Sequence, residues 1–82
     1  MDETEILARL AQIVRHTLDD NRIVLVRSSE AGTIEGWDSI AHVHIMIAVE
    51  ENFGIRFEGN ELSNMPNIGA LIDSIAAKLA MK

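Results

Sequence analysis

Cysteine is missing from this chain of 82 residues. Without a thiol, the chain cannot form a disulfide framework or a zinc-thiolate site, and it has no cysteine nucleophile. Aromatic residues make up only 4% of the sequence, and none of them is a tyrosine. The hydrophobic core must therefore consist mainly of aliphatic side chains and methionine. That composition is typical of small helical bundles and unusual in β-sandwiches and barrels.

Basic residues are also scarce. The chain has 7 lysines and arginines against 13 aspartates and glutamates, which gives a formal net charge of −6 at pH 7. Nucleic-acid backbones and anionic membrane surfaces attract positive charge, so we expect neither of them as a partner. A basic protein surface is the partner that this charge favours.

Long hydrophobic runs are absent as well. The longest apolar stretches, residues 23–26 and 45–49, are far shorter than a membrane span. The acidic amino terminus, with Asp2, Glu3 and Glu5, is unlike a signal peptide. We therefore expect a cytoplasmic monomer without membrane insertion. The length is sufficient for a single domain over residues 1–82, with a thin core and no cleft between lobes.

Two segments carry the periodicity of amphipathic helices. The amino-terminal segment, capped by Thr4 or Asp2, is expected to end at residues 19–21, whose Asp-Asp-Asn sequence favours a turn. The final segment follows Asn67, a good N-cap residue. Their apolar positions are Ile6, Leu10, Ile13, Val14 and Leu18 in the first segment and Ile68, Leu71, Ile72, Ile75 and Leu79 in the last.

A third helix is predicted from Asp38-Ser39 to about Phe53-Gly54, because Gly54 is a natural carboxyl-terminal stop. Two apolar stripes run along this helix. The pattern alone leaves open whether both stripes are buried or one of them forms an exposed docking surface. The first stripe contains Ile45, Met46, Val49 and Phe53, and the second contains Ile40, Val43 and Ile47 and continues into Glu50 and Glu51.

The connections between these helices are less regular. Residues 23–26 favour a strand by propensity, but no second run of this kind exists to pair with them, so we expect a long ordered loop that buries these apolar side chains. Residues 55–57 alternate like an extended segment, and residues 59–64 have room for one helical turn or a loop. The sequence thus predicts an all-α bundle of three main helices plus one short helix, with a long loop between the first and second.

Motifs of the common enzyme classes do not occur in the sequence. It has no glycine-rich phosphate loop, no G-x-S-x-G elbow and no H-E-x-x-H motif. His42 and His44 are about 200° apart around a helix, so they cannot bind one metal ion. We expect His44 to be exposed and His42 to lie at a boundary. His16, on the first helix, suggests no catalytic triad with Ser39. We expect neither an enzyme nor a metal site.

The most informative stretch is residues 36–40, Gly-Trp-Asp-Ser-Ile. Asp38-Ser39 before an apolar periodic run is, at its simplest, a helix N-cap. The same geometry places the Ser39 hydroxyl at the positive end of the helix dipole, where a phosphate ester is favoured. The pattern therefore fits both a structural cap and a serine that carries a phosphate-linked group.

The whole chain resembles the acyl carrier protein family, including its peptidyl carrier domains. The resemblance rests on residues 36–40, on Phe53-Gly54-Ile55 fourteen residues after Ser39, and on Asn67-Ile68 at the start of the last helix. It implies an acyl-carrier-like bundle in which Ser39 receives 4′-phosphopantetheine from coenzyme A through a phosphopantetheinyl transferase, with Asp38 recognised beside it. The arm's thiol then holds acyl or aminoacyl groups as thioesters.

The resemblance also implies partners and their contact residues. The carrier presents its cargo to acyl-activating, ketosynthase or acyltransferase-type enzymes of fatty acid, polyketide or other specialised biosynthesis. The resemblance assigns the Phe53 stripe to the interior and the Ile40 stripe to the surface. The implied partner-docking residues are Ile40, Val43, His44, Ile47, Glu50 and Glu51, and the implied acyl-pocket residues are Met46, Val49, Phe53, Ile68 and Leu71.

The sequence departs from the family pattern on the helix that begins at Asp38-Ser39. Ala41 and His44 stand where carriers of fatty acid synthesis usually bear acids, and Asn52 replaces a third consecutive acid. These differences favour a dedicated carrier of a specialised pathway. The alternative to a carrier is an unmodified helical interaction module that binds a partner through Ile40, Val43 and Ile47, with Ser39 acting only in the cap.

Overall fold

The computed structural model describes residues 2–59 and 67–81. Within these two ranges it contains three α-helices, α1 (Glu3–Leu18), α2 (Ser39–Phe53) and α4 (Ile68–Ala80), with a short 3-10 turn, η1 (Ala31–Thr33), before α2. No β-strand occurs in these two ranges. The predicted all-α fold with its three main helices is confirmed. The short helix expected within residues 59–64 falls largely on residues 60–64, which lie outside the described part.

Each helix begins at a side chain that accepts a hydrogen bond from a backbone N–H of the first turn. Asp2 accepts from Glu5, Asp38 from Ala41 and Asn67 from Ala70, each at 2.8 Å. These bonds satisfy donors that have no partner within the helix. Asp2, rather than Thr4, is thus the cap of α1.

The first two helices end on residues in the left-handed backbone region. Asp19 has φ 52° after α1, and Gly54 has φ 67° after α2. The Asp19 N–H donates to the carbonyls of Arg15 and His16, and the Gly54 N–H donates to that of Glu50. Both ends predicted from the sequence are therefore correct, one at a turn-forming aspartate and the other at a glycine.

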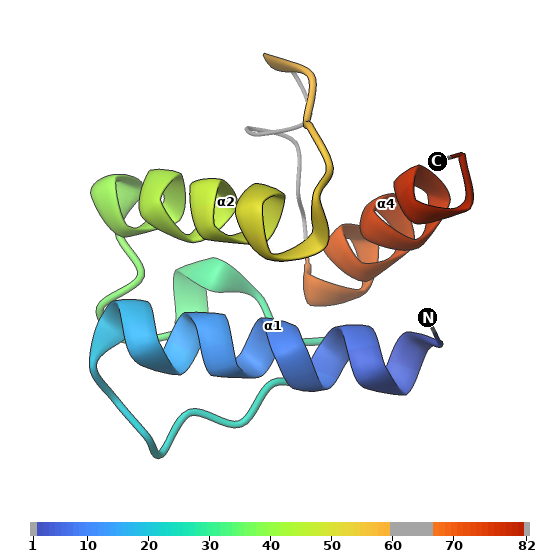
Figure 1. Cartoon of the computed structure of the whole chain (residues 1–82). Helices are drawn as coiled ribbons and strands as arrows, with labels where there is room; N and C mark the ends of the chain where they lie inside the picture. Colours follow the sequence, from blue (N-terminus) through green and yellow to red (C-terminus); the bar gives the residue numbers. More distant parts are fainter. Residues whose placement is uncertain (1, 60–66, 82) are drawn as a thin grey trace.

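Helices α1 and α2 lie side by side and run in opposite directions, and α4 packs across one end of this pair (Figure 1). Figure 1 also places both labelled termini on the side of the molecule where α4 lies. One hydrophobic core fills the space between the helices. Its fully buried side chains include Ile6, Leu10 and Val14 from α1, Ile45, Met46 and Val49 from α2, and Leu71, Ile72 and Ile75 from α4.

The connection over residues 19–38 is a long loop, as predicted, but it buries less than expected. Leu25 is buried and Ile23 is half-buried, whereas Val24 and Val26 are exposed. Consecutive side chains alternate between the core and the solvent, as they do in an extended segment. The expectation that the whole apolar run is buried was therefore wrong for its two valines.

The loop is held by hydrogen bonds to α4 and by ion pairs to α4 and α1. The carbonyls of Ser29 and Arg27 accept the first N–H groups of α4, those of Ile68 and Gly69, both at 2.8 Å. The Arg27 guanidinium also forms ion pairs with Asp73 of α4, at 3.0 Å, and with Glu3 of α1. The loop thus caps α4 and joins it to α1.

No helix in the described residues is both long enough and apolar enough to cross a membrane.

Candidate functional site

Ser39 is the first residue of α2 and is exposed to solvent. The Asp38 carboxylate accepts the Ala41 N–H at 2.8 Å, and the Asp38 carbonyl accepts the His42 N–H at 2.9 Å. The Ser39 hydroxyl therefore lies at the positive end of the α2 dipole, on a turn fixed by two hydrogen bonds to its neighbour. A negatively charged ester is favoured at such a position.

The backbone that leads into Ser39 is also tightly folded. Gly36 has φ 90°, a backbone conformation that residues other than glycine rarely adopt. The Trp37 N–H donates to the Ile34 carbonyl at 3.2 Å, and the Asp38 N–H donates to the Gly36 carbonyl at 3.1 Å. Trp37 is half-buried against the core. The serine thus follows a short turn that the interior of the protein supports.

A side-chain contact that the sequence pattern does not predict joins this turn to α2. The Trp37 indole Nε1–H donates a hydrogen bond to His42 Nδ1 at 3.1 Å, and the two ring centroids are 6.1 Å apart. His42 lies at a boundary, as predicted, and it is half-buried there. The signal in the sequence is an aromatic donor just before the cap with a histidine five residues later.

The two stripes of α2 have different environments. Ile45, Met46, Val49 and Phe53 are buried. On the other side, Ile40, Val43 and Ile47 are 70%, 55% and 47% exposed, and we call these three residues the exposed strip. His44 and Glu51 are exposed on the same helix. The division between an inward Phe53 stripe and an outward Ile40 stripe is therefore confirmed.

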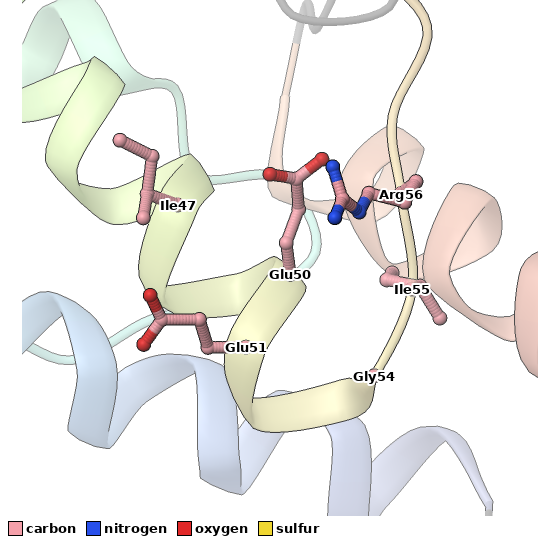
Figure 2. Close-up of a pocket in the computed structure, with 6 residues that line it drawn as sticks. All are labelled: Ile47, Glu50, Glu51, Gly54, Ile55 and Arg56. Atoms are coloured by element: carbon pink, nitrogen blue, oxygen red, sulfur yellow. The ribbon is translucent and has the colours of Figure 1, made fainter.

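Glu50 differs from Glu51 in its contacts. It is half-buried, its carboxylate accepts the Phe57 N–H at 2.8 Å, and its carbonyl accepts the Ile55 N–H at 3.1 Å. Figure 2 shows the Glu50 carboxylate and the Arg56 guanidinium pointing toward one another, with Glu51 directed away from them. Glu50 thus fixes the chain that leaves α2, and Glu51 is the more exposed acid of the pair.

An open groove of about 510 Å³ adjoins the end of α2 (Figure 2). Ile47 of the exposed strip forms part of its wall, so the groove continues the surface that begins beside Ser39. Its lining residues are Ile47, Glu50, Glu51, Gly54, Ile55 and Arg56.

The five residues expected to line an acyl pocket are all buried and belong to one core cluster. They come from two helices, with Met46, Val49 and Phe53 on α2 and Ile68 and Leu71 on α4. The structure thus brings the predicted residues together in the interior. Their role toward a cargo remains a prediction.

Within residues 2–59 and 67–81, no group of three or more histidine, aspartate or glutamate side chains is placed to hold a metal ion. His16 is exposed on α1 and lines a groove with Ala48 and Asn52 of α2.

The fold and the exposed serine can be compared with known proteins. No family model matches the chain. An acyl carrier protein of Acidothermus cellulolyticus is 28% identical to it, over 93% of this chain and 90% of that protein. The solution structure of the holo acyl carrier protein from Geobacter metallireducens is 37% identical, with a TM-score of 0.84 over 92% of this chain and 86% of that one.

These likenesses extend over nearly the full length of both relatives. Together with the helical fold of the described residues, they define a small helical carrier protein. The chain belongs to the acyl carrier protein family. Members of this family carry acyl groups, and the family implies a phosphopantetheine prosthetic group and association with biosynthetic enzymes.

Proposed function

We propose that the chain carries acyl or aminoacyl groups on a 4′-phosphopantetheine arm attached to Ser39. The observation that carries this proposal is the exposed serine in the first turn of α2, directly after the Asp38 cap. A surface hydroxyl at a helix amino terminus fits the arm's phosphodiester, because the helix dipole favours its negative charge.

The attachment needs a separate phosphopantetheinyl transferase, with coenzyme A as donor. The Ser39 oxygen forms a bond to the phosphorus next to the pantetheine, and the pyrophosphate bond of coenzyme A breaks. Adenosine 3′,5′-bisphosphate leaves, and a base on the transferase takes the hydroxyl proton. Asp38 presents its carboxylate beside the serine for recognition by the transferase.

The arm supplies a terminal thiol that holds the cargo as a thioester. The chain itself contributes position and recognition and catalyses no reaction. We assign recognition of partner enzymes to the exposed strip with His44, Glu50 and Glu51. The apolar area on α2 and the adjoining groove support this assignment. Met46, Val49, Phe53, Ile68 and Leu71 are the proposed lining for an acyl chain, since they are apolar and buried between helices.

The partners that we propose are acyl-activating, ketosynthase or acyltransferase-type enzymes of fatty acid, polyketide or other specialised biosynthesis. The first turn of α2 contains no acid, and this feature favours a dedicated partner over a general one. We propose a single-domain monomer that works in the cytoplasm. The composition and charge of the chain support that setting.

Intact-mass measurement tests the attachment. The protein is incubated with coenzyme A and a purified transferase of broad specificity, and the same transferase is shown to be active on a control carrier. We expect the mass to rise by one phosphopantetheinyl unit. The Ser39→Ala variant should keep its original mass, because the attacking oxygen is gone.

An unmodified wild-type protein beside a modified control carrier would contradict the proposal. The remaining candidate would then be the unmodified interaction module. In that case Ser39→Ala retains partner binding, whereas a charge placed in the exposed strip, as in Val43→Asp, abolishes it.

A further inference from the structure

We propose that Trp37 and His42 are positioning residues that hold Ser39 in place for its modification. The proposal rests on the proposed function, because it concerns the rate at which Ser39 accepts the phosphopantetheine arm. Neither side chain is expected to touch the reacting atoms. Each acts through the turn that carries the serine.

The geometry of the contact supports this role. Trp37 lies two residues before Ser39 and His42 lies three residues after it, so their hydrogen bond of 3.1 Å spans the start of the helix. Trp37 precedes the helix, whereas His42 belongs to it. Both are half-buried, which shields the bond from competing water. The hydrogen bond between these two side chains thus links the two ends of the segment 37–42, which contains Ser39.

The other bonds of this turn do not replace that link. The Asp38 carboxylate and carbonyl join residue 38 to the first turn of α2, and the Trp37 and Asp38 N–H groups bond to Ile34 and Gly36 within the preceding segment, so none of these bonds joins Trp37 to the helix. The indole of Trp37 fixes that segment to both the core and His42. An enzyme that must align the Ser39 hydroxyl loses rate when the hydroxyl samples more orientations.

The contact also fixes the tautomer of the neutral imidazole. An indole N–H is only a donor, so His42 Nδ1 must accept, and the neutral ring carries its proton on Nε2. This tautomer is a spectroscopic signature of the contact, and it can be measured independently of any enzyme.

Four variants test the proposal in the full-length protein. His42→Ala removes the acceptor, and Trp37→Phe keeps an aromatic ring but removes the donor. His42→Asn places an amide oxygen near the position of Nδ1 and restores an acceptor. His16→Ala, an exposed histidine on α1, is the matched control. The transferase reaction with coenzyme A is followed for each protein, after circular dichroism has shown that it is folded.

We expect kcat/KM for modification of Ser39 to fall about three- to tenfold in His42→Ala and Trp37→Phe, the loss expected for one hydrogen bond. His42→Asn should recover most of the rate, and His16→Ala should match the wild type. In the wild-type protein, NMR should show an unprotonated Nδ1 on His42 and slow exchange of the Trp37 indole proton.

Failure of this proposal differs from failure of the carrier function. A wild-type protein that is never modified contradicts the carrier function. Equal rates in the wild type, His42→Ala and Trp37→Phe overturn the positioning role alone, as does a proton on His42 Nδ1. A loss in His42→Ala without recovery in His42→Asn also overturns it, because packing of the ring would then be the cause.

Discussion

At the scale of single residues, Asp38 combines an observed structural role with a proposed one. Its carboxylate caps α2 through the Ala41 N–H, and the same group is the proposed recognition feature beside Ser39. Asparagine caps a helix about as well as aspartate, because its side-chain oxygen accepts the same hydrogen bond. The charge can therefore be removed while the cap is retained.

We predict that Asp38→Ala lowers the free energy of unfolding by about 1 kcal/mol and that Asp38→Asn lowers it by less than about 0.5 kcal/mol. Urea denaturation followed by circular dichroism measures both values. If the transferase recognises the carboxylate, both variants are modified more slowly than the wild type. Normal modification of Asp38→Asn would limit Asp38 to its role as a cap.

Gly69 shows how closely the loop and α4 approach each other. A Cβ atom at this position would lie 3.2 Å from the Arg27 carbonyl oxygen and 3.2 Å from its guanidinium. That carbonyl accepts the Gly69 N–H at 2.8 Å, so it cannot move away without breaking the hydrogen bond. The close approach outweighs the usual helix preference of alanine over glycine.

Gly69→Ala should therefore destabilise the protein by about 1 kcal/mol, as overpacking does elsewhere. Gly32→Ala is the matched control, because a Cβ there has no atom within 4 Å and the backbone has no positive φ. Thermal and urea unfolding compare the two variants. If the Gly69→Ala protein were as stable as the wild type, the loop at Arg27 would be able to move away from the added methyl group at little cost.

At the scale of elements, α2 combines a structural face with a surface face. Ile45 is fully buried, whereas Ile47, two residues later, is 47% exposed. Residues two positions apart on a helix point to different sides, so the same residue type has two different environments within one turn. The buried face secures the fold, and the exposed strip is available to a partner.

This division gives a matched pair of substitutions. Ile45→Ala should cost about 2–5 kcal/mol, because it leaves a cavity in the core. Ile47→Ala should change stability by less than about 0.5 kcal/mol, since its side chain is on the surface. Ile47→Ala should instead weaken binding to a partner enzyme, measured with the phosphopantetheinylated protein. A large loss of stability in Ile47→Ala would contradict the assignment.

The elements also show what the sequence could predict. The helix ends could be predicted from the sequence because Asp38, Asn67 and Gly54 each form a hydrogen bond to a residue only three or four positions away in the chain. The position of the 19–38 loop could not be predicted in the same way, because the backbone carbonyls of Arg27 and Ser29 accept its hydrogen bonds from α4. A carbonyl carries no information about residue type, so such contacts depend on the tertiary fold.

The candidate site was predictable to a similar degree. Helical periodicity predicts the two stripes of α2, whereas the choice of Ser39 and of the Ile40 stripe as the exposed one comes from the carrier resemblance. The Trp37–His42 hydrogen bond and the bond from Phe57 to Glu50 join residues across a helix end. The Trp37–His42 bond also requires the backbone to turn at Gly36, and the spacing of the residues does not specify that turn.

At the scale of the whole molecule, a thin aliphatic core and a net charge of −6 suit a protein that presents a group to other proteins. The core joins α1, α2 and α4, and Arg27 links α1 to α4 at the surface. A thiol is absent from the sequence. In the proposed function the reactive thiol belongs to the arm, so the chain needs to provide only the serine that anchors it.

The central claim is that Ser39 is the attachment point, and site mapping tests it most directly. The protein is incubated with coenzyme A and transferase and then cut into peptides, which are fragmented in a mass spectrometer. The chain has five serines, at positions 28, 29, 39, 63 and 74. We predict the added phosphopantetheinyl mass on Ser39 alone. The same mass on another serine, or no added mass beside a modified control carrier, would contradict the account.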